Sequence, residues 1–154
     1  MKIASVSSLI LLASASFFSQ GALAAWQTLP GNACVSSLGT QTSLYNVSGD
    51  TGLVRTGSSP GWLTCPIHRN LLVRKTVYVN LNHPTGRTTT CKVVRSNYST
   101  GASSTSSGSK TGTGNLTITL SAANLGEVQN GDTFTISCNV AQGTILRGTS
   151  WEDN

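Results

Sequence analysis

The sequence predicts an all-β protein: an immunoglobulin-like or jelly-roll-like antiparallel β-sandwich of about eight short strands. Three observations predict it. Apolar and polar residues alternate with a period of two in several segments, no segment carries a convincing helical stripe of apolar residues, and turn residues recur about every 8 to 12 positions. A sheet with one apolar face must cover that face. Without helices, a second sheet has to do so.

The first 24 residues have the composition of a secretory signal peptide. Lys2 supplies a positive charge, residues 3–18 are apolar or small, and Ala22 and Ala24 occupy the two positions that a signal peptidase reads. We therefore expect cleavage after Ala24, or at the neighbouring position, and one exported domain from 25 to 154. An uncleaved membrane anchor is disfavoured because the apolar run is short and interrupted by serines. No later segment is apolar enough to span a membrane.

The charge pattern argues against a nucleic-acid partner. The chain has 10 Lys and Arg against 5 Asp and Glu, a formal net charge of +5. The basic residues are scattered, with only Arg74 and Lys75 adjacent, and they are not interleaved with aromatic residues along one surface. We interpret them as a mildly basic, solvated surface.

Four cysteines in an exported chain indicate two disulfides. The chain has neither a C-x-x-C pair nor a Cys/His cluster with zinc-ligand spacing. Spacing alone leaves three connectivities open. Cys91 and Cys138 both fall on the inward phase of their expected strands, so a bond between them can lie in the core. We therefore predict a Cys91–Cys138 bond and, by elimination, a Cys34–Cys65 bond.

The strand candidates follow one another along the chain, with Thr and Ser at many of the polar positions. In β-strands successive side chains point to opposite faces, so Val77, Val79 and Leu81 are expected to be buried while Thr76 and Tyr78 face outward. The predicted strands are residues 26–30, 44–47, 53–55, 62–67, 76–81, 91–94, 116–121 and 133–140, and a final strand is expected within the tail at 143–154.

The segment 99–114 interrupts this series of strands. It is rich in Ser, Gly and Thr and has no large apolar residue, so we predict a flexible loop there. Residues 121–129 can hold one helical turn at most, because Gly126 disfavours more. Asn130 and Gly131 give the strongest turn signal in the chain, just before the strand that contains Phe134.

The order of these features resembles a known pattern. It comprises Cys34, the element Cys65-Pro66-Ile67-His68-Arg69, the strand Val77-Tyr78-Val79, the strand at Cys91-Lys92-Val93, and Cys138 on the strand that begins near Phe134. This order is similar to that of a family of short uncharacterised secreted bacterial proteins, which have a signal peptide, a Cys-Pro-Ile/Leu-x-Arg element and two disulfides on a β-sandwich. The resemblance implies an exported β-sandwich and transfers no activity.

Catalytic candidates are few. Beyond the signal segment the carboxylates are Asp50, Glu127, Asp132, Glu152 and Asp153, and the histidines are His68 and His83. Acid–base catalysis needs paired titratable groups and calcium needs clustered oxygen ligands, but these residues are scattered or lie in turns. The chain also lacks a Gly-x-Ser-x-Gly elbow. We predict no catalytic residue, no cofactor and no metal site, and a small secreted hydrolase using either histidine is the least favoured alternative.

A binding role suits this composition better. Tyr45, Tyr78, Tyr98, Trp62 or Trp151 could stack on a sugar ring, and of these we expect both tryptophans to pack in the core or at a sandwich end. Tyr78, on an outward phase, is predicted to be the best exposed aromatic and the surface-recognition residue, with cross-strand packing as its alternative role.

The sequence therefore predicts a secreted or periplasmic protein that acts by non-catalytic surface recognition. A glycan or another cell-envelope component is the candidate partner. The alternative is a subunit of an extracellular assembly that works through a sheet edge. The last residues, 150–154, lack the alternating apolar strand common in such subunits.

Overall fold

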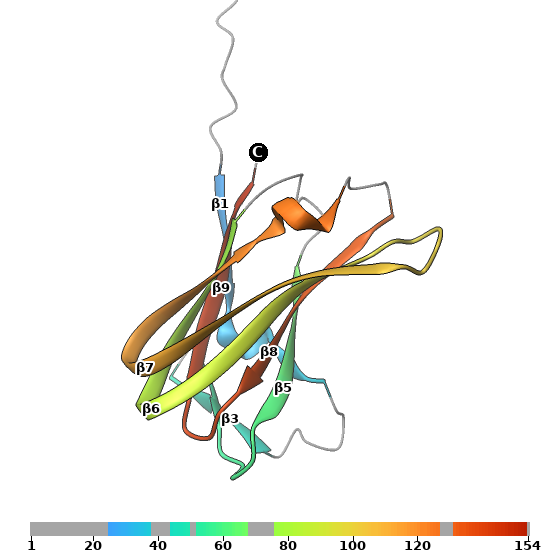
Figure 1. The fold of residues 1–154 in the computed structure, drawn as a ribbon. Helices are drawn as coiled ribbons and strands as arrows, with labels where there is room; N and C mark the ends of the chain where they lie inside the picture. Colours follow the sequence, from blue (N-terminus) through green and yellow to red (C-terminus); the bar gives the residue numbers. More distant parts are fainter. Residues whose placement is uncertain (1–24, 38–43, 50–51, 68–75, 127–130, 154) are drawn as a thin grey trace, which may run out of the picture.

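The computed structural model describes residues 25–37, 44–49, 52–67, 76–126 and 131–153, which form an all-β fold (Figure 1). The predicted signal peptide at 1–24 lies outside the described residues. The elements are β1 (Ala25–Pro30), η1 (Gly31–Ala33), β2 (Val35–Ser36), β3 (Tyr45–Ser48), β4 (Gly52–Arg55), β5 (Gly61–Ile67), β6 (Thr76–Ser96), β7 (Ser103–Ser121), η3 (Ala122–Leu125), β8 (Thr133–Val140) and β9 (Ile145–Asp153).

Strand β6 joins the two layers of the fold. Its first half pairs with β9, from Val77 to Asn82, and its second half pairs with β8, from Thr90 to Ser96. Between these halves the register against β7 shifts, and β6 and β7 bend together at the lower left of Figure 1. The described sheet therefore runs β2-β5-β8-β6-β9-β4-β3, with all pairs antiparallel, and it folds at the middle of β6 into a sandwich.

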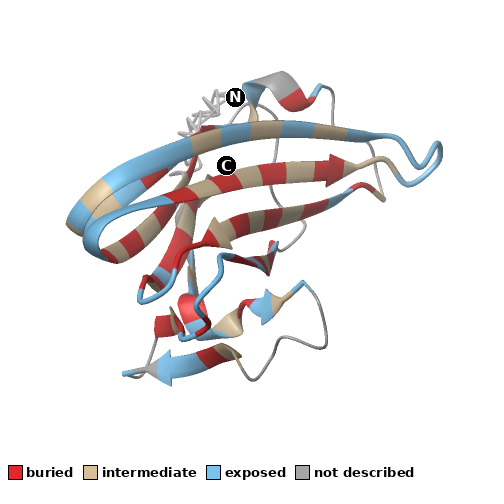
Figure 2. Ribbon diagram, turned by 60° about the horizontal axis from the view of Figure 1, so that its bottom comes forward, coloured by how far each residue is buried: buried red, intermediate tan, exposed pale blue. Residues whose placement is uncertain are grey.

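The core lies between the two layers and takes every second residue of the long strands. Figure 2 shows this alternation as red and tan bands. Val77 and Val79 from one layer and Val93 and Ile136 from the other are all fully buried and belong to one hydrophobic cluster. The predicted inward phases and the predicted antiparallel sandwich are thus confirmed.

Both predicted disulfides are present. Cys34 is bonded to Cys65, and Cys91 is bonded to Cys138, which is its direct partner across β6 and β8. All four are buried. Each bond restricts the unfolded chain, which on a loop-entropy model stabilises the fold by about 3–4 kcal/mol.

The prediction of a flexible loop at 99–114 is wrong, and two of the strands are longer than expected. Strand β6 has 21 residues and β7 has 19. Strand β7 begins at Ser103, so most of the segment that we expected to be a flexible loop is paired with β6. The connection between the two strands is confined to residues 97–102.

Packing explains why this part of β7 has no large side chain. Its inward residues include Gly108, which pairs with Cys91 of β6. Because β7 is bent, Gly108 also faces residues 118–120 near the end of β7 itself. A Cβ atom at Gly108 would lie 3.1 Å from the carbonyl oxygen of Thr119 and 3.2 Å from Leu120 Cδ2. The interior is already filled by residues that follow in the same strand, so a small residue is required there.

We predict that Gly108→Val lowers the free energy of unfolding by about 1–3 kcal/mol, because the added side chain overpacks the interior. The control is Ser107→Val, on the exposed face of the same strand, where a change within about 0.5 kcal/mol is expected. Urea unfolding followed by tryptophan fluorescence measures both. Equal costs for the two variants would contradict this account of β7.

Candidate functional site

The structure separates the candidate aromatic residues by their exposure. Tyr45 and Trp151 are buried, which confirms the core role predicted for Trp151. Trp62 is 36% exposed on the outer side of β5, with Lys92 Nζ 4.9 Å from its ring centroid, so of the two predicted roles, packing in the core or at a sandwich end, the core role is wrong. Tyr98 is 80% exposed, whereas Tyr78 is half-buried. The prediction that Tyr78 is the best exposed aromatic was therefore wrong as well.

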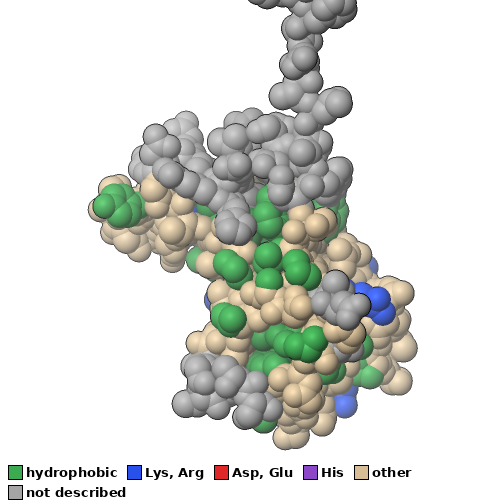
Figure 3. Space-filling view, turned by 180° about the vertical axis from the view of Figure 1, so that it is seen from behind, with side chains coloured by type: hydrophobic (Ala, Val, Ile, Leu, Met, Phe, Trp, Pro, Cys, Tyr) green, Lys and Arg blue, Asp and Glu red, His purple; other side chains and the backbone are tan. Residues whose placement is uncertain are grey.

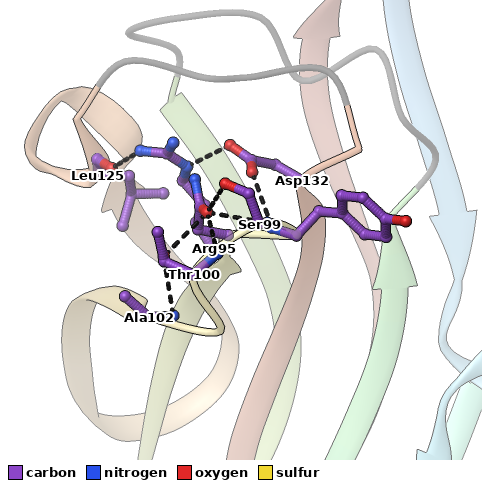
Figure 4. A network of polar contacts seen from close by, with 8 residues as sticks. Arg95, Ser99, Thr100, Ala102, Leu125 and Asp132 are labelled. Carbon is purple, nitrogen blue, oxygen red and sulfur yellow. Dashed lines mark hydrogen bonds and ion pairs between the residues drawn. The ribbon is translucent and has the colours of Figure 1, made fainter.

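The most exposed tyrosine lies at the end of the β6–β7 hairpin, which a buried ion pair ties to the start of β8 (Figure 4). Arg95 Nε donates to Asp132 Oδ2 at 2.6 Å, and Arg95 Nη1 donates to the carbonyl oxygen of Leu125 at 2.7 Å. The two side chains are 9% and 0% exposed. The other oxygen, Asp132 Oδ1, accepts the backbone N–H of Tyr98 at 3.3 Å. Both carboxylate oxygens are thus engaged in holding the hairpin end.

The turn between the strands is organised by Asn97. Its Oδ1 accepts from the backbone N–H groups of Ser99 at 3.1 Å and Thr100 at 2.9 Å, and from their two hydroxyls at 2.8 and 2.9 Å. The Asn97 N–H also donates to the carbonyl of Ala102 at 2.8 Å. Such side-chain-to-backbone bonds restrict a turn that would otherwise be free to move. Tyr98 is therefore presented on a fixed backbone.

A hollow of about 370 Å³ adjoins Tyr98. A Cβ atom at Gly131, whose φ is +98°, would lie 3.0 Å from Tyr98 Cβ, so the absence of a side chain lets the tyrosine pack closely. The lining residues are Ile67, Tyr98, Gly131, Asp132, Thr133 and Phe134. The hollow thus combines aromatic and aliphatic surface with the hydroxyls of Thr133 and Tyr98, and its carboxylate is already paired with Arg95.

A second hollow, of about 490 Å³, lies on the outer face of β1, β6 and β9. The register places Tyr78 opposite Ser150 and Asn80 opposite Gly148, so Tyr78 is adjacent to this hollow. The lining residues are Thr28, Leu29, Pro30, Asn80, Arg147, Gly148, Thr149 and Ser150. On the face seen in Figure 3, the Lys and Arg side chains lie near the margins and no described acidic side chain appears.

The described catalytic candidates do not form a catalytic arrangement. Asp132 is the only carboxylate whose side chain the structure describes, and it is engaged with Arg95. His83 is 2% exposed, with its Nε2 2.9 Å from the hydroxyl of Thr89. A hydrolase would need that imidazole between a nucleophile and a carboxylate. Among the described residues no cluster of three or more His, Cys, Asp and Glu could hold a metal ion. His68 lies outside them.

Neither a scan of protein-family models nor a comparison with curated proteins found a match. Solved structures similar to the chain include three whose descriptions concern carbohydrate-binding modules. One, described as "CBM4 structure and function", has 15% identity and a TM-score of 0.46 over 83% of this chain and 82% of that chain. The second is the carbohydrate-binding module CBM6cm-2 from Cellvibrio mixtus lichenase 5A in complex with cellotriose. It has 14% identity and a TM-score of 0.46 over 83% of this chain and 97% of that chain. The third is TmCBM61 in complex with β-1,4-galactotriose. It has 16% identity and a TM-score of 0.36 over 83% of this chain and 83% of that chain. At such values the likeness carries no information about what this chain binds.

In the part of the chain that the structure describes, none of the helices could span a lipid bilayer.

The sequence interpretation missed the Arg95–Asp132 pair, although a signal for it existed. Arg95 continues the inward phase of Cys91 and Val93, and a charged side chain on a buried phase needs a partner. Asp132 was assigned a backbone role in a turn. Nothing in the local sequence connects the two residues, which are 37 positions apart.

We predict that Asp132→Asn lowers the free energy of unfolding by about 3–5 kcal/mol, because it leaves the Arg95 guanidinium buried without a counter-charge. The double variant Arg95→Met/Asp132→Leu removes both charges and is expected to recover a large part of that loss. Chemical denaturation of the three proteins measures these differences. A cost below about 1 kcal/mol for Asp132→Asn would show that the pair does not hold the hairpin end.

Burial lowers the pKa of His83 below its ordinary value of 6.5, and the backbone groups of Gly112 and Arg87 oppose this shift only in part. The unfolded chain therefore binds a proton near pH 6.5 that the folded chain does not yet bind. Stability should be full above that pH and should fall as the pH decreases below it, by at most about 1.4 kcal/mol per pH unit for one proton.

Urea midpoints of the wild type and of His83→Gln between pH 7.5 and 5.5 measure this effect. The range lies above the ordinary carboxyl pKa values, so the carboxylates contribute little. The wild type should lose stability toward pH 5.5 and His83→Gln should lose less. Identical pH profiles would contradict the prediction.

Proposed function

We propose that the protein is a non-catalytic glycan-binding module and that it binds sugar at the end of the β6–β7 hairpin. The observation that carries this proposal is Tyr98, an aromatic side chain that is 80% exposed, stands on a hydrogen-bonded turn and borders a hollow of about 370 Å³. Tyrosine offers a large and rigid contact surface at a low cost in conformational entropy, and exposed tyrosines are common anchors in binding surfaces.

The composition of the hollow favours a sugar. A pyranose ring has an apolar face of C–H groups, which can stack on an aromatic ring, and a rim of hydroxyls, which need hydrogen-bond partners. Tyr98 and Phe134 offer aromatic surface, and Thr133 and the tyrosine hydroxyl offer hydrogen bonds. Because Asp132 is neutralised by Arg95, this end of the molecule suits an uncharged ligand.

The fixed turn contributes to affinity through entropy. Ordering a mobile loop on binding costs free energy, whereas the hydrogen bonds of Asn97 and Asp132 already hold the backbone at Tyr98. The buried ion pair, which is expensive in desolvation, then has a role in presenting the tyrosine.

Tyr78 is proposed as a second recognition residue, on the sheet face. It lies next to the hollow of β1, β6 and β9, and it would offer a smaller stacking surface because it is half-buried. Cross-strand packing against the side chains of β7 and β9 is its alternative role.

The proposed place of action is outside the cytoplasm. The two disulfides are typical of exported proteins. We propose that residues 1–24 are a cleaved signal peptide and that residues 25–154 form the single mature domain, which would meet glycans at the cell surface or in the periplasm.

We predict that the mature protein retains a neutral glycan on an array and that Tyr98→Ala weakens binding at least about tenfold, because stacking is lost. Tyr98→Phe should remain within about threefold of the wild type, since the ring stays. Trp62→Ala is the matched control, because Trp62 is also a partly exposed aromatic but lies on β5. Tyr78→Ala tests the second surface in the same assay.

An unchanged unfolding midpoint of Tyr98→Ala will show that the fold is intact. Absence of binding to every glycan and cell-envelope fraction, or equal losses for Tyr98→Ala and Trp62→Ala, would overturn the proposal.

One observation favours the alternative of an assembly subunit. Among the described strands, β7 pairs only with β6, so its other edge is free to accept a strand from a partner. Sedimentation velocity over a hundredfold concentration range separates the alternatives, because an assembly subunit should form oligomers and a binding module should stay monomeric.

A further inference from the structure

We infer that the hollow on β1, β6 and β9 is a second binding site and that it takes a negatively charged group, a carboxylate or a sulfate, on a polysaccharide. This inference rests on the proposed function in one respect, namely that the ligand is a polysaccharide. The charge of the ligand and the place where it binds are argued from the hollow itself.

The hollow is formed by a close approach of two strands. Thr28 and Pro30 pair with Ser150 and Gly148, respectively, so that β1 borders β9 here. A Cβ atom at Gly148 would lie 2.6 Å from the carbonyl oxygen of Leu29, so no side chain can project at this position without moving β1. Gly148 and its neighbours on β1 and β9 line a depression of about 490 Å³.

Arg147 is the charged group of this depression. It is exposed, and no hydrogen bond or ion pair joins its guanidinium to another described residue. By contrast, the two buried arginines of the described part have acceptors: Arg95 bonds Asp132 and Arg55 bonds the carbonyl oxygen of Ser59. Arg147 is therefore available to a ligand.

The neighbouring side chains add hydrogen-bond donors. Asn80 Oδ1 already accepts the hydroxyl of Thr117 at 3.0 Å, which leaves the amide Nδ2 of Asn80 as the group that can bind a ligand. Thr28 and Ser150 contribute hydroxyls. Beside the apolar surface of Leu29 and Pro30, the depression thus offers an arginine, an amide donor and hydroxyls, and none of its lining residues is a carboxylate.

This set of groups discriminates by charge. A guanidinium binds a carboxylate or a sulfate through two parallel charge-assisted bonds, which are stronger than bonds to a neutral hydroxyl. Tyr78, opposite Ser150, lies beside the depression and can contact the adjacent sugar ring.

The experiment compares three soluble polymers in affinity electrophoresis: dextran, polygalacturonate and dextran sulfate. We expect Arg147→Gln to weaken binding to a charged polymer about tenfold and to leave any binding to dextran unchanged. Asn80→Asp, which places a carboxylate in the depression, should weaken binding at least as much. Polygalacturonate and dextran sulfate distinguish a carboxylate from a sulfate.

The control for general charge attraction is Arg87→Gln. Arg87 is also exposed and loses the same charge, but it lies at the bend of β6. Equal losses for Arg87→Gln and Arg147→Gln, or no binding to either charged polymer, would overturn the inference. Tyr98→Ala is measured alongside: if Arg147→Gln has no effect while Tyr98→Ala abolishes neutral-glycan binding, the second site is rejected and the proposed function stands.

Discussion

The bend in β6 is the constraint on which the remaining structure depends. A strand that is apolar on one face must be covered on that face, and here one hairpin supplies a strand pair to each layer. The first half of β6 buries Val77 and Val79, and the second half buries Cys91 and Val93, all on the side that faces the other layer. The register shift between His83 and Arg87 turns the strand by enough to bring these faces together. The Cys91–Cys138 bond then fixes the second half to β8.

This constraint also marks the limit of what the sequence could predict. The alternation of Val77 to Leu81 and of Phe134 to Val140 is set by local geometry, so the strands, their inward faces and both disulfides followed from it. The strand at 103–114 could not be predicted in this way. Its small residue Gly108 is required because it packs against Leu120, and that packing exists only after the hairpin has bent. A segment without large apolar residues was interpreted as having nothing to bury, when the space it faces is filled from elsewhere.

The two surfaces that we propose for binding were predicted only in part, for a related reason. Outward phase identified Tyr78 as facing solvent, but the strand pattern says nothing of how far neighbours on β7 and β9 cover its ring. Tyr98 lies in a turn, where no phase applies, and its exposure depends on the pair formed by Arg95 and Asp132 from distant parts of the chain. Contacts over such separations are set by the fold as a whole and not by local sequence.

The two proposed surfaces lie on opposite sides of the same bend, since Asn80 belongs to the first half of β6 and Arg95 to the second. Their separation is therefore fixed by a single continuous strand and by the pairs that hold its halves to β9 and β8. A polymer long enough to reach both surfaces would gain from a high effective concentration at the second surface once it had bound the first. A rigid link also imposes a condition on the ligand. Only a polysaccharide whose neutral and charged sugar units have a spacing that matches the two surfaces could occupy both surfaces at once. The stiffness of the bent hairpin, more than the chemistry of either surface alone, would then select among polysaccharides.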